Sequence, residues 1–302
     1  MKAKLLSKLA SFKQARNARK LKNNVPRWLM WCIFALFVLY AITLLYPFLW
    51  MLVNSFKETS EFLTHINGFP KNWAFTSYTN GVFRYGSASG MNIVQMFGMS
   101  AILTIAGAFV SVFFSCCAAY TVSKYNFIGK KLIYGVAVFM MVVPIVGSLP
   151  GQVRMMQDFK MYDTVIGLLF LYSGAFGLNF ILFYAFFVNI SWSYAEAARV
   201  DGANDFIIFF RIMIPLAKGP IIAVFILQAI GLWNDYSTPA IFLPSLTTLA
   251  VGLDEIKTAA MQQMDYPAMF AAVMITVLPM LVLFACFQKT IMENTIIGGL
   301  KG

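Results

Sequence analysis

The sequence of 302 residues has few of the side chains from which active sites are built. It contains one histidine, His65, and only 12% of its residues are charged. A single imidazole with no second histidine or cysteine beside it excludes most metal sites and most histidine-activated nucleophiles. The phosphate-binding loop G-x-x-x-x-G-K-[ST] is absent as well, so this chain does not bind ATP through that motif. We expect no catalytic residue and no metal site.

Cysteine is also scarce, and its placement excludes two further kinds of site. The four cysteines fall inside long apolar runs, where neither a disulfide framework nor a zinc site has its usual context. They are Cys32, Cys116, Cys117 and Cys286. We interpret them as small buried apolar residues.

Apolar residues, by contrast, are abundant. The chain is 60% hydrophobic and 16% aromatic, which argues against a soluble protein. Runs long enough to cross a hydrocarbon layer of about 30 Å, which takes about 20 residues, are found along the whole chain. They lie near 28–53, 91–123, 132–149, 164–189, 212–233 and 269–288. The third run is short, and Pro144, Gly147 and Pro150 indicate a kinked or broken end.

These runs predict an all-α fold: a polytopic membrane protein with six transmembrane helices. Residues 28–288 would form its transmembrane domain, between a basic N-terminal tail (1–27) and a C-terminal tail (289–302). The first run follows a long basic tail and exceeds the apolar core of a signal peptide, so we expect it to be retained.

The basic charge of the chain, +11 at pH 7, follows this topology. Nine Lys and Arg residues lie in 1–27, three each in 124–131 and 190–219, and two in 289–302, which is 17 of the 23. This bias predicts that these segments and both termini are cytoplasmic, and it gives no reason to expect a nucleic-acid partner. Residues 2–22 have one apolar face among lysines and arginines, which predicts an interfacial helix on anionic membrane lipid. A disordered basic tail is the alternative.

Residues 191–220 are polar and basic, although they lie between two apolar runs. Ser193 and Glu196 have the S-x-x-E spacing of a capping box, which predicts a helix from about Tyr194. Arg199 follows Glu196 by three residues, a spacing at which the two side chains can pair on a helix surface.

The same helix would carry small residues along one narrow face. Ala195, Ala198 and Gly202 are spaced to share that face, which lets another surface approach the backbone closely. Gly202 also ends the helix at little cost, because a residue without a β-carbon accepts a positive φ.

A second helix is predicted directly afterwards. Asn204 or Asp205 can act as its N-cap, and the helix would carry three phenylalanines until Pro215 interrupts it. These phenylalanines are Phe206, Phe209 and Phe210.

The spacing of this stretch resembles the EAA loop of permease subunits in binding-protein-dependent ABC importers, E-A-A, three residues, G, nine residues, I-x-L-P. Here Glu196, Ala197 and Ala198 are followed at these intervals by Gly202 and by Ile212-Met213-Ile214-Pro215, with Ile214 in place of leucine. In that family the loop, here 191–220, is a coupling helix that fits a cleft on a separate ATPase. The implied coupling residues are Glu196, Ala197, Ala198, Arg199, Asp201, Gly202, Ile212 and Pro215.

A second resemblance lies at the end of the second apolar run. Small residues predict a close-packing helix face there: Gly107, Ser111, Ser115, Ala118 and Ala119. The sequence from Ala118 to Lys130 is similar to A-A-Y-A-[FL]-[SA]-[RK]-x-x-F-x-G-[RK] of carbohydrate permeases of the maltose type. The resemblance runs from about residue 30 to the C-terminus and favours the smaller of the two permease subunits.

This resemblance implies a set of partners and a mechanism. The partners are a second, larger permease subunit, a dimer of ATP-binding cassette ATPases that holds ATP and magnesium, an extracytoplasmic sugar-binding protein and the lipid of a bacterial inner membrane. The mechanism is alternating access, in which ATP-driven closure of the ATPases opens the spans outward. The chain itself would need no cofactor.

The resemblance also implies roles for residues in the C-terminal tail, the translocation path and the contact with the binding protein, although their side chains alone do not indicate these roles. The C-terminal tail, with Gly298, Gly299 and Lys301, would reach between the ATPases, or it is a frayed end. Four polar or aromatic residues could line the translocation path or simply tie helices together: Asn179, Gln228, Trp233 and Asn234. The loop 237–266, with Asp254, Glu255 and Asp265, is the expected contact with the binding protein.

Three alternatives compete with a sugar permease. A permease for another solute, such as glycerol phosphate or a polyamine, shares nearly all these motifs, but the predicted span interiors supply no clear Arg or Lys for an anion. A membrane enzyme would need clustered acids, bases or metal ligands in those interiors, which are nearly free of charge. A scaffold protein would not need the complete EAA spacing.

Overall fold

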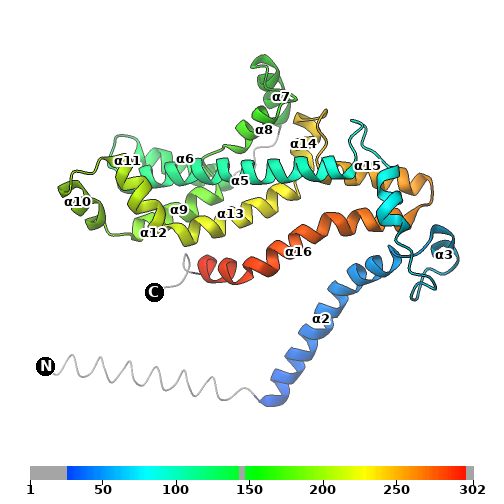
Figure 1. Ribbon diagram of the computed structural model, residues 1–302. Helices are drawn as coiled ribbons and strands as arrows, with labels where there is room; N and C mark the ends of the chain where they lie inside the picture. The colour runs from blue at the N-terminus through cyan, green and yellow to red at the C-terminus, as the bar shows by residue number, and fades with distance from the viewer. Residues whose placement is uncertain (1–25, 143–146, 297–302) are drawn as a thin grey trace. The chain divides into compact units, whose positions relative to one another are not determined.

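The computed structural model describes residues 26–142 and 147–296, and every regular element in these ranges is a helix (Figure 1). The chain divides after Asn54 into two compact units. The first contains α2 (Arg27–Asn54), an apolar helix of 28 residues that includes Pro47. At 1.5 Å per residue it is longer than the roughly 30 Å hydrocarbon layer. The first predicted span is therefore a single helix.

The second unit is built around α5 (Ile93–Lys124), which packs against α9 (Leu178–Asn189) and α13 (Lys218–Trp233) (Figure 1). The predicted small-residue face of α5 is confirmed for Gly107, Ser111, Ser115 and Ala119, which are all buried, whereas Ala118 is only half-buried. A β-carbon on Gly107 would lie 2.9 Å from side-chain atoms of Leu232 and Tyr172. Small side chains therefore set how closely α5 approaches its neighbours.

The predicted span 164–189 is wrong as a continuous helix. The structure contains α8 (Val165–Tyr172) and α9, separated by residues 173–177. This break has two glycines, and Gly177 has a φ of 144°, which a residue with a β-carbon rarely adopts. The third run also departs from the prediction: α6 (Lys130–Val142) has 13 residues and α7 (Leu149–Asp158) follows, with 143–146 outside the described residues.

Within the described residues, three helices are long and apolar enough to cross a membrane: α2, α5 and the part Tyr266–Lys289 of α16 (Tyr266–Ile296). The number rises to five if each of two bent helix pairs is one span. The shorter α6 falls below the roughly 20 residues of a straight crossing.

The stretches outside these helices are also largely helical. The predicted loop 237–266 contains α14 (Ser237–Phe242) and α15 (Leu249–Gln262), and α15 packs against α5 and α16. Residues 54–90 contain α3 (Thr59–Thr64), the π-helix η1 (Ser77–Gly81) and α4 (Val82–Arg84). These segments cover one end of the second unit (Figure 1).

Candidate functional site

The candidate site is the stretch 191–220, whose first helix is α10 (Ser193–Val200). Its axis is bent by 69° from α9. The predicted capping box is wrong: the N-cap is Trp192, which already has helical dihedral angles, φ −68° and ψ −18°, and no side chain caps the helix. Because the chain enters the helix at Trp192, Ser193 lacks the extended backbone of a cap. Its hydroxyl lies 2.7 Å from that of Ser191 instead.

The end of α10 confirms the prediction for Gly202. This residue has a φ of +83°, and no other atom would lie within 4 Å of a β-carbon placed on it. The amide of Gly202 donates to the carbonyl of Arg199 at 3.0 Å, and the amide of Ala203 donates to that of Ala198 at 2.9 Å. These two bonds form a Schellman motif, which satisfies carbonyls at the helix end and reverses the chain.

The two faces of α10 differ sharply in exposure. Ala195 is fully buried and Ala198 is 9% exposed, and both belong to an apolar cluster formed by this chain's own helices. The surface that approaches the small-residue face is therefore the core of this chain, which corrects the expectation of a partner there. Glu196, Ala197 and Val200 lie on the opposite, exposed face. This exposed face is the part of α10 that a partner can contact.

The second predicted helix begins with Asn204, one of the two expected N-caps. Its side chain accepts a hydrogen bond from the amide of Ile207 at 2.9 Å. The helix runs through α11 (Asp205–Ile208), the π-helix η2 (Phe209–Met213) and α12 (Ile214–Leu216), so the expectation that Pro215 interrupts it is wrong. Pro215 has no amide proton to donate within the helix. The wide turn of the π-helix η2 lies directly before α12, which contains Pro215.

The turn away from this helix comes after Pro215, at the junction with α13. Residues 205–216 are bent by 76° from α13. Ile212 is half-buried and packs against the same apolar cluster as α10, whereas Pro215 and Asp201 are exposed. The predicted coupling residues therefore fall into an exposed set and a set that holds the loop together.

Arg199 does not pair with Glu196. Its guanidinium donates to the carboxylate of Asp205 at 2.7 Å and lies 5.3 Å from the ring centre of Trp192. The Schellman turn reverses the chain and thereby brings Asp205 back beside Arg199. No residue of the described chain forms an ion pair with Glu196. The charge of Glu196 is therefore available to a partner on the exposed face of α10.

The pair also affects protonation. The hydrogen bond from Arg199 holds the pKa of Asp205 below its ordinary value of 3.8, and the same contact raises the pKa of Arg199. A carboxyl group whose pKa is lower in the folded state stabilises the fold at pH values above its unfolded pKa. This stabilisation is lost as the pH falls through its folded pKa. The pair therefore stays ionised at neutral pH.

A charge reversal tests this pair. Transport is the activity that the resemblance to importer permeases implies, and we expect Arg199→Glu to lower it severalfold, because two carboxylates would then face each other across the turn. The double variant Arg199→Glu/Asp205→Arg restores the opposite charges and should recover most of the loss. Transport by the purified importer measures both. Equal transport in the single and double variants would contradict a role for the pair.

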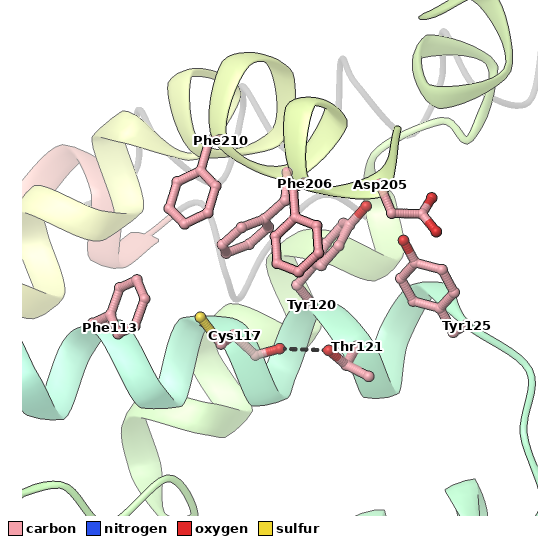
Figure 2. A pocket seen from close by; sticks show the side chains of 9 residues that line it. Phe113, Cys117, Tyr120, Thr121, Tyr125, Asp205, Phe206 and Phe210 are labelled. Carbon is pink, nitrogen blue, oxygen red and sulfur yellow. Dashed lines mark hydrogen bonds between the residues drawn. The ribbon is translucent and has the colours of Figure 1, made fainter. Parts of the chain in front are cut away.

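A pocket of about 430 Å³ lies between the C-terminal half of α5 and the helix that begins at Asp205 (Figure 2). Phenylalanine and tyrosine rings line most of it, and the Asp205 carboxylate and the Tyr125 hydroxyl lie near each other at one end. Along α5, Cys117 lies between Phe113 at the far end of the pocket and Tyr125. α5 and the loop therefore contact each other mainly through aromatic rings.

The four residues expected to line the translocation path differ in burial and in hydrogen-bond partners. The Asn179 side chain donates to the Gln228 side chain at 2.9 Å, which joins α9 to α13. Trp233 is 5% exposed, and its indole nitrogen donates to the carbonyl of Thr276 at 3.1 Å, so it offers no free stacking face. Asn234 is exposed and donates to the carbonyl of Ile230 at 2.8 Å.

The three acidic residues expected to contact a binding protein also differ. Asp265 is buried, and it accepts hydrogen bonds from the hydroxyls of Thr59 at 2.8 Å and Tyr85 at 3.0 Å. It therefore joins segments of this chain. Asp254 is exposed and lies beside Lys257, whereas Glu255 is half-buried and accepts a hydrogen bond from the amide of Ala88 at 2.9 Å.

Several structural residues are not apparent from the sequence. Lys57 is fully buried and donates to the carbonyls of His65 and Ile66, and burial lowers its pKa. Nothing in the sequence distinguishes it from a solvated lysine. The positions Gly298, Gly299 and Lys301 and the N-terminal residues 2–22 lie outside the described residues.

Over residues 26–142 and 147–296 the chain contains only helices, with three to five candidate spans and a short helix bent out of the bundle, which is the architecture of a polytopic membrane protein. The model of one protein family, described as the binding-protein-dependent transport system inner membrane component, matches residues 111–292. The chain belongs to this family. It is therefore a multi-pass permease of the inner membrane, and its transport system includes a separate ATPase and a binding protein.

Relatives extend the similarity over most of the chain. The diacetylchitobiose uptake system permease protein NgcG of Streptomyces coelicolor is 31% identical over 265 residues, which cover 85% of this chain and 84% of the relative. The inner membrane ABC transporter permease protein YcjP of Escherichia coli is 30% identical, with 93% and 99% covered. The arabinooligosaccharides transport system permease protein AraQ of Bacillus subtilis is 29% identical, with 88% and 94% covered.

The fold also matches a chain in the crystal structure of a bacterial ABC transporter involved in the import of the acidic polysaccharide alginate. The TM-score is 0.71 and the sequence identity is 24%, with 87% of this chain and 96% of that chain covered. This similarity shows that the two chains share a fold.

Proposed function

We propose that this chain is the smaller permease subunit of an ATP-driven importer for a sugar or oligosaccharide. The relatives named for diacetylchitobiose and arabinooligosaccharides support this substrate class. The chain pairs with a larger permease subunit and forms half of the translocation path. A dimeric ATPase binds ATP and magnesium, and an extracytoplasmic binding protein delivers the sugar.

The observation that carries this proposal is the geometry of α10. The helix is bent out of the bundle by 69°, its alanine face is anchored in the core, and Glu196, Ala197 and Val200 are exposed. A short helix held in this way can enter a cleft of the ATPase and still move with the bundle. α10 is thus the coupling helix of the chain.

The topology follows from this role. The loop 191–220 faces the cytoplasm, together with the N-terminal tail 1–27 and the C-terminal tail 289–302. The six spans contain α2, α5, α6, α8 with α9, α13 and α16. α10 to α12 then form a cytoplasmic hairpin between two of the spans. This topology agrees with the distribution of Lys and Arg in the sequence.

Transport follows an alternating-access cycle. ATP closes the two ATPases, α10 moves with its cleft, and the spans open toward the loaded binding protein. Hydrolysis then returns the inward-facing state. Such coupling requires that ATP and the loaded binding protein favour the same global state.

The substrate class is tested with the complete importer, consisting of both permeases, the ATPase and the binding protein in lipid vesicles. We expect the ATPase rate to rise when the binding protein is loaded with one oligosaccharide from a panel. Binding protein without ligand serves as the control. Stimulation by glycerol phosphate alone would overturn the sugar assignment and leave the permease assignment intact.

A further inference from the structure

The last turn of α5 contacts the point where the chain enters α10. The ammonium group of Lys124 donates to the carbonyl of Ile190 at 2.5 Å. Tyr125, the C-cap of α5, lies edge-to-face with Trp192, with ring centres 5.9 Å apart. α5 therefore holds the start of α10 through contacts that bypass the backbone of α9.

Tyr120 extends these contacts to both sides of α10. Its side chain is 4% exposed, and its ring centre lies 5.7 Å from that of Tyr125. Phe187 of α9 lies 5.5 Å away and Phe209 of η2 lies 4.9 Å away. The helices before and after α10 therefore pack on the same ring of α5. Tyr120 and Phe209 also line the aromatic pocket of Figure 2.

Arg199 completes the arrangement from the other end of α10. It lies over the ring of Trp192 and pairs with Asp205, so it joins the end of α10 to its start and to α11. We call the connected residues the clasp: Tyr120, Tyr125, Trp192, Arg199 and Asp205.

The backbone by itself would transmit a displacement of α10 poorly. α10 is joined to its neighbours by the turns 190–192 and 201–204, and the second contains Gly202 with its positive φ. Short turns of this kind can absorb a change of direction, whereas close-packed aromatic rings shift together because packed side chains deform little. The clasp supplies the stiff connection that the turns lack.

We propose that Tyr125 and Trp192 are positioning residues that fix α10 to α5, so that a movement of α10 passes directly to α5. This inference rests on the proposed function of α10 as the coupling helix. It adds α5 as the element that receives the movement.

The test compares Tyr125→Leu with Tyr125→Phe in the complete importer. The measured quantity is sugar imported per ATP hydrolysed. We expect Tyr125→Leu to lower this ratio at least fivefold while the ATPase still binds and hydrolyses ATP. Tyr125→Phe keeps the ring and should retain the ratio. A general loss of folding would lower both activities together and leave the ratio unchanged.

A matched control removes a similar ring elsewhere. Tyr134 of α6 pairs with Tyr184 of α9, with ring centres 4.6 Å apart, and among the described residues no ring pair joins it to a residue of the clasp. Tyr134→Leu should leave the ratio at the wild-type value. Trp192→Leu, which removes the ring that contacts both Tyr125 and Arg199, should reproduce the effect of Tyr125→Leu.

Two outcomes would overturn the inference. One is an unchanged ratio in both Tyr125→Leu and Trp192→Leu. The other is a failure of both variants to assemble, which would make the clasp a folding element. Neither result affects the role of α10. That proposed function fails separately if the wild-type ATPase does not bind this chain through α10.

Discussion

Replacing Gly202 by valine should reduce sugar import about tenfold or more while the importer still assembles. The residue has a φ of +83° and ends α10 in a Schellman motif. A β-branched residue in this conformation costs about 1 to 3 kcal/mol, so the chain would leave the turn in another direction. The Arg199–Asp205 pair and the exposed face of α10 both depend on that turn.

Gly202→Asn is the matched variant, because asparagine tolerates positive φ far better than valine. It should retain most of the import. Gly129, with a φ of +93° and open surroundings, provides a control position outside the loop. Gly129→Val imposes a similar backbone strain at that position and should leave sugar import close to the wild-type rate. If Gly202→Val imports at the wild-type rate, the turn does not set the position of α10.

Replacing Gly167 by alanine should destabilise the protein by about 3 kcal/mol or more. A β-carbon at this position of α8 would lie 1.9 Å from the carbonyl oxygen of Met161. The obstacle is backbone, which cannot rotate away as a side chain can. The loop that precedes α8 would have to move. We therefore expect a large fall in the amount of monodisperse protein after solubilisation and in its unfolding temperature.

Gly174→Ala is the control for this prediction. Gly174 lies in the break between α8 and α9, and a β-carbon placed on it would meet no other atom within 4 Å. The unfolding temperature of this variant should remain close to that of the wild type. Equal stability of Gly167→Ala and the wild type would mean that the segment before α8 is less closely packed than the structure shows.

Features set by short-range patterns could be predicted from the sequence. The small-residue face of α5, the N-cap at Asn204 and the positive φ of Gly202 each follow from residue types at a fixed spacing. The capping box failed because Trp192 is already helical, and a local motif does not reveal where a helix begins when tertiary packing holds its first turn.

Features that depend on distant contacts could not be predicted. Asp205 pairs with Arg199 only because the turn at Gly202 reverses the chain. Asp265 is buried because Thr59 and Tyr85, far away in sequence, bring hydroxyl groups to it. The break at 173–177 lies inside a long run whose overall hydrophobicity predicts a continuous span, and the two glycines in it, Gly174 and Gly177, were its only local sign.

The central claim is that α10 enters the ATPase, and photo-cross-linking tests it most directly. A photoreactive amino acid is placed at Val200, which is 87% exposed, or at Ile128, a still more exposed residue between α5 and α6. In the assembled importer we expect a cross-link from Val200 to the ATPase that is stronger than any from Ile128 and that changes when ATP is bound. Cross-links from Val200 that are no stronger than those from Ile128, with ATP or without it, would contradict the assignment of α10 as the coupling helix.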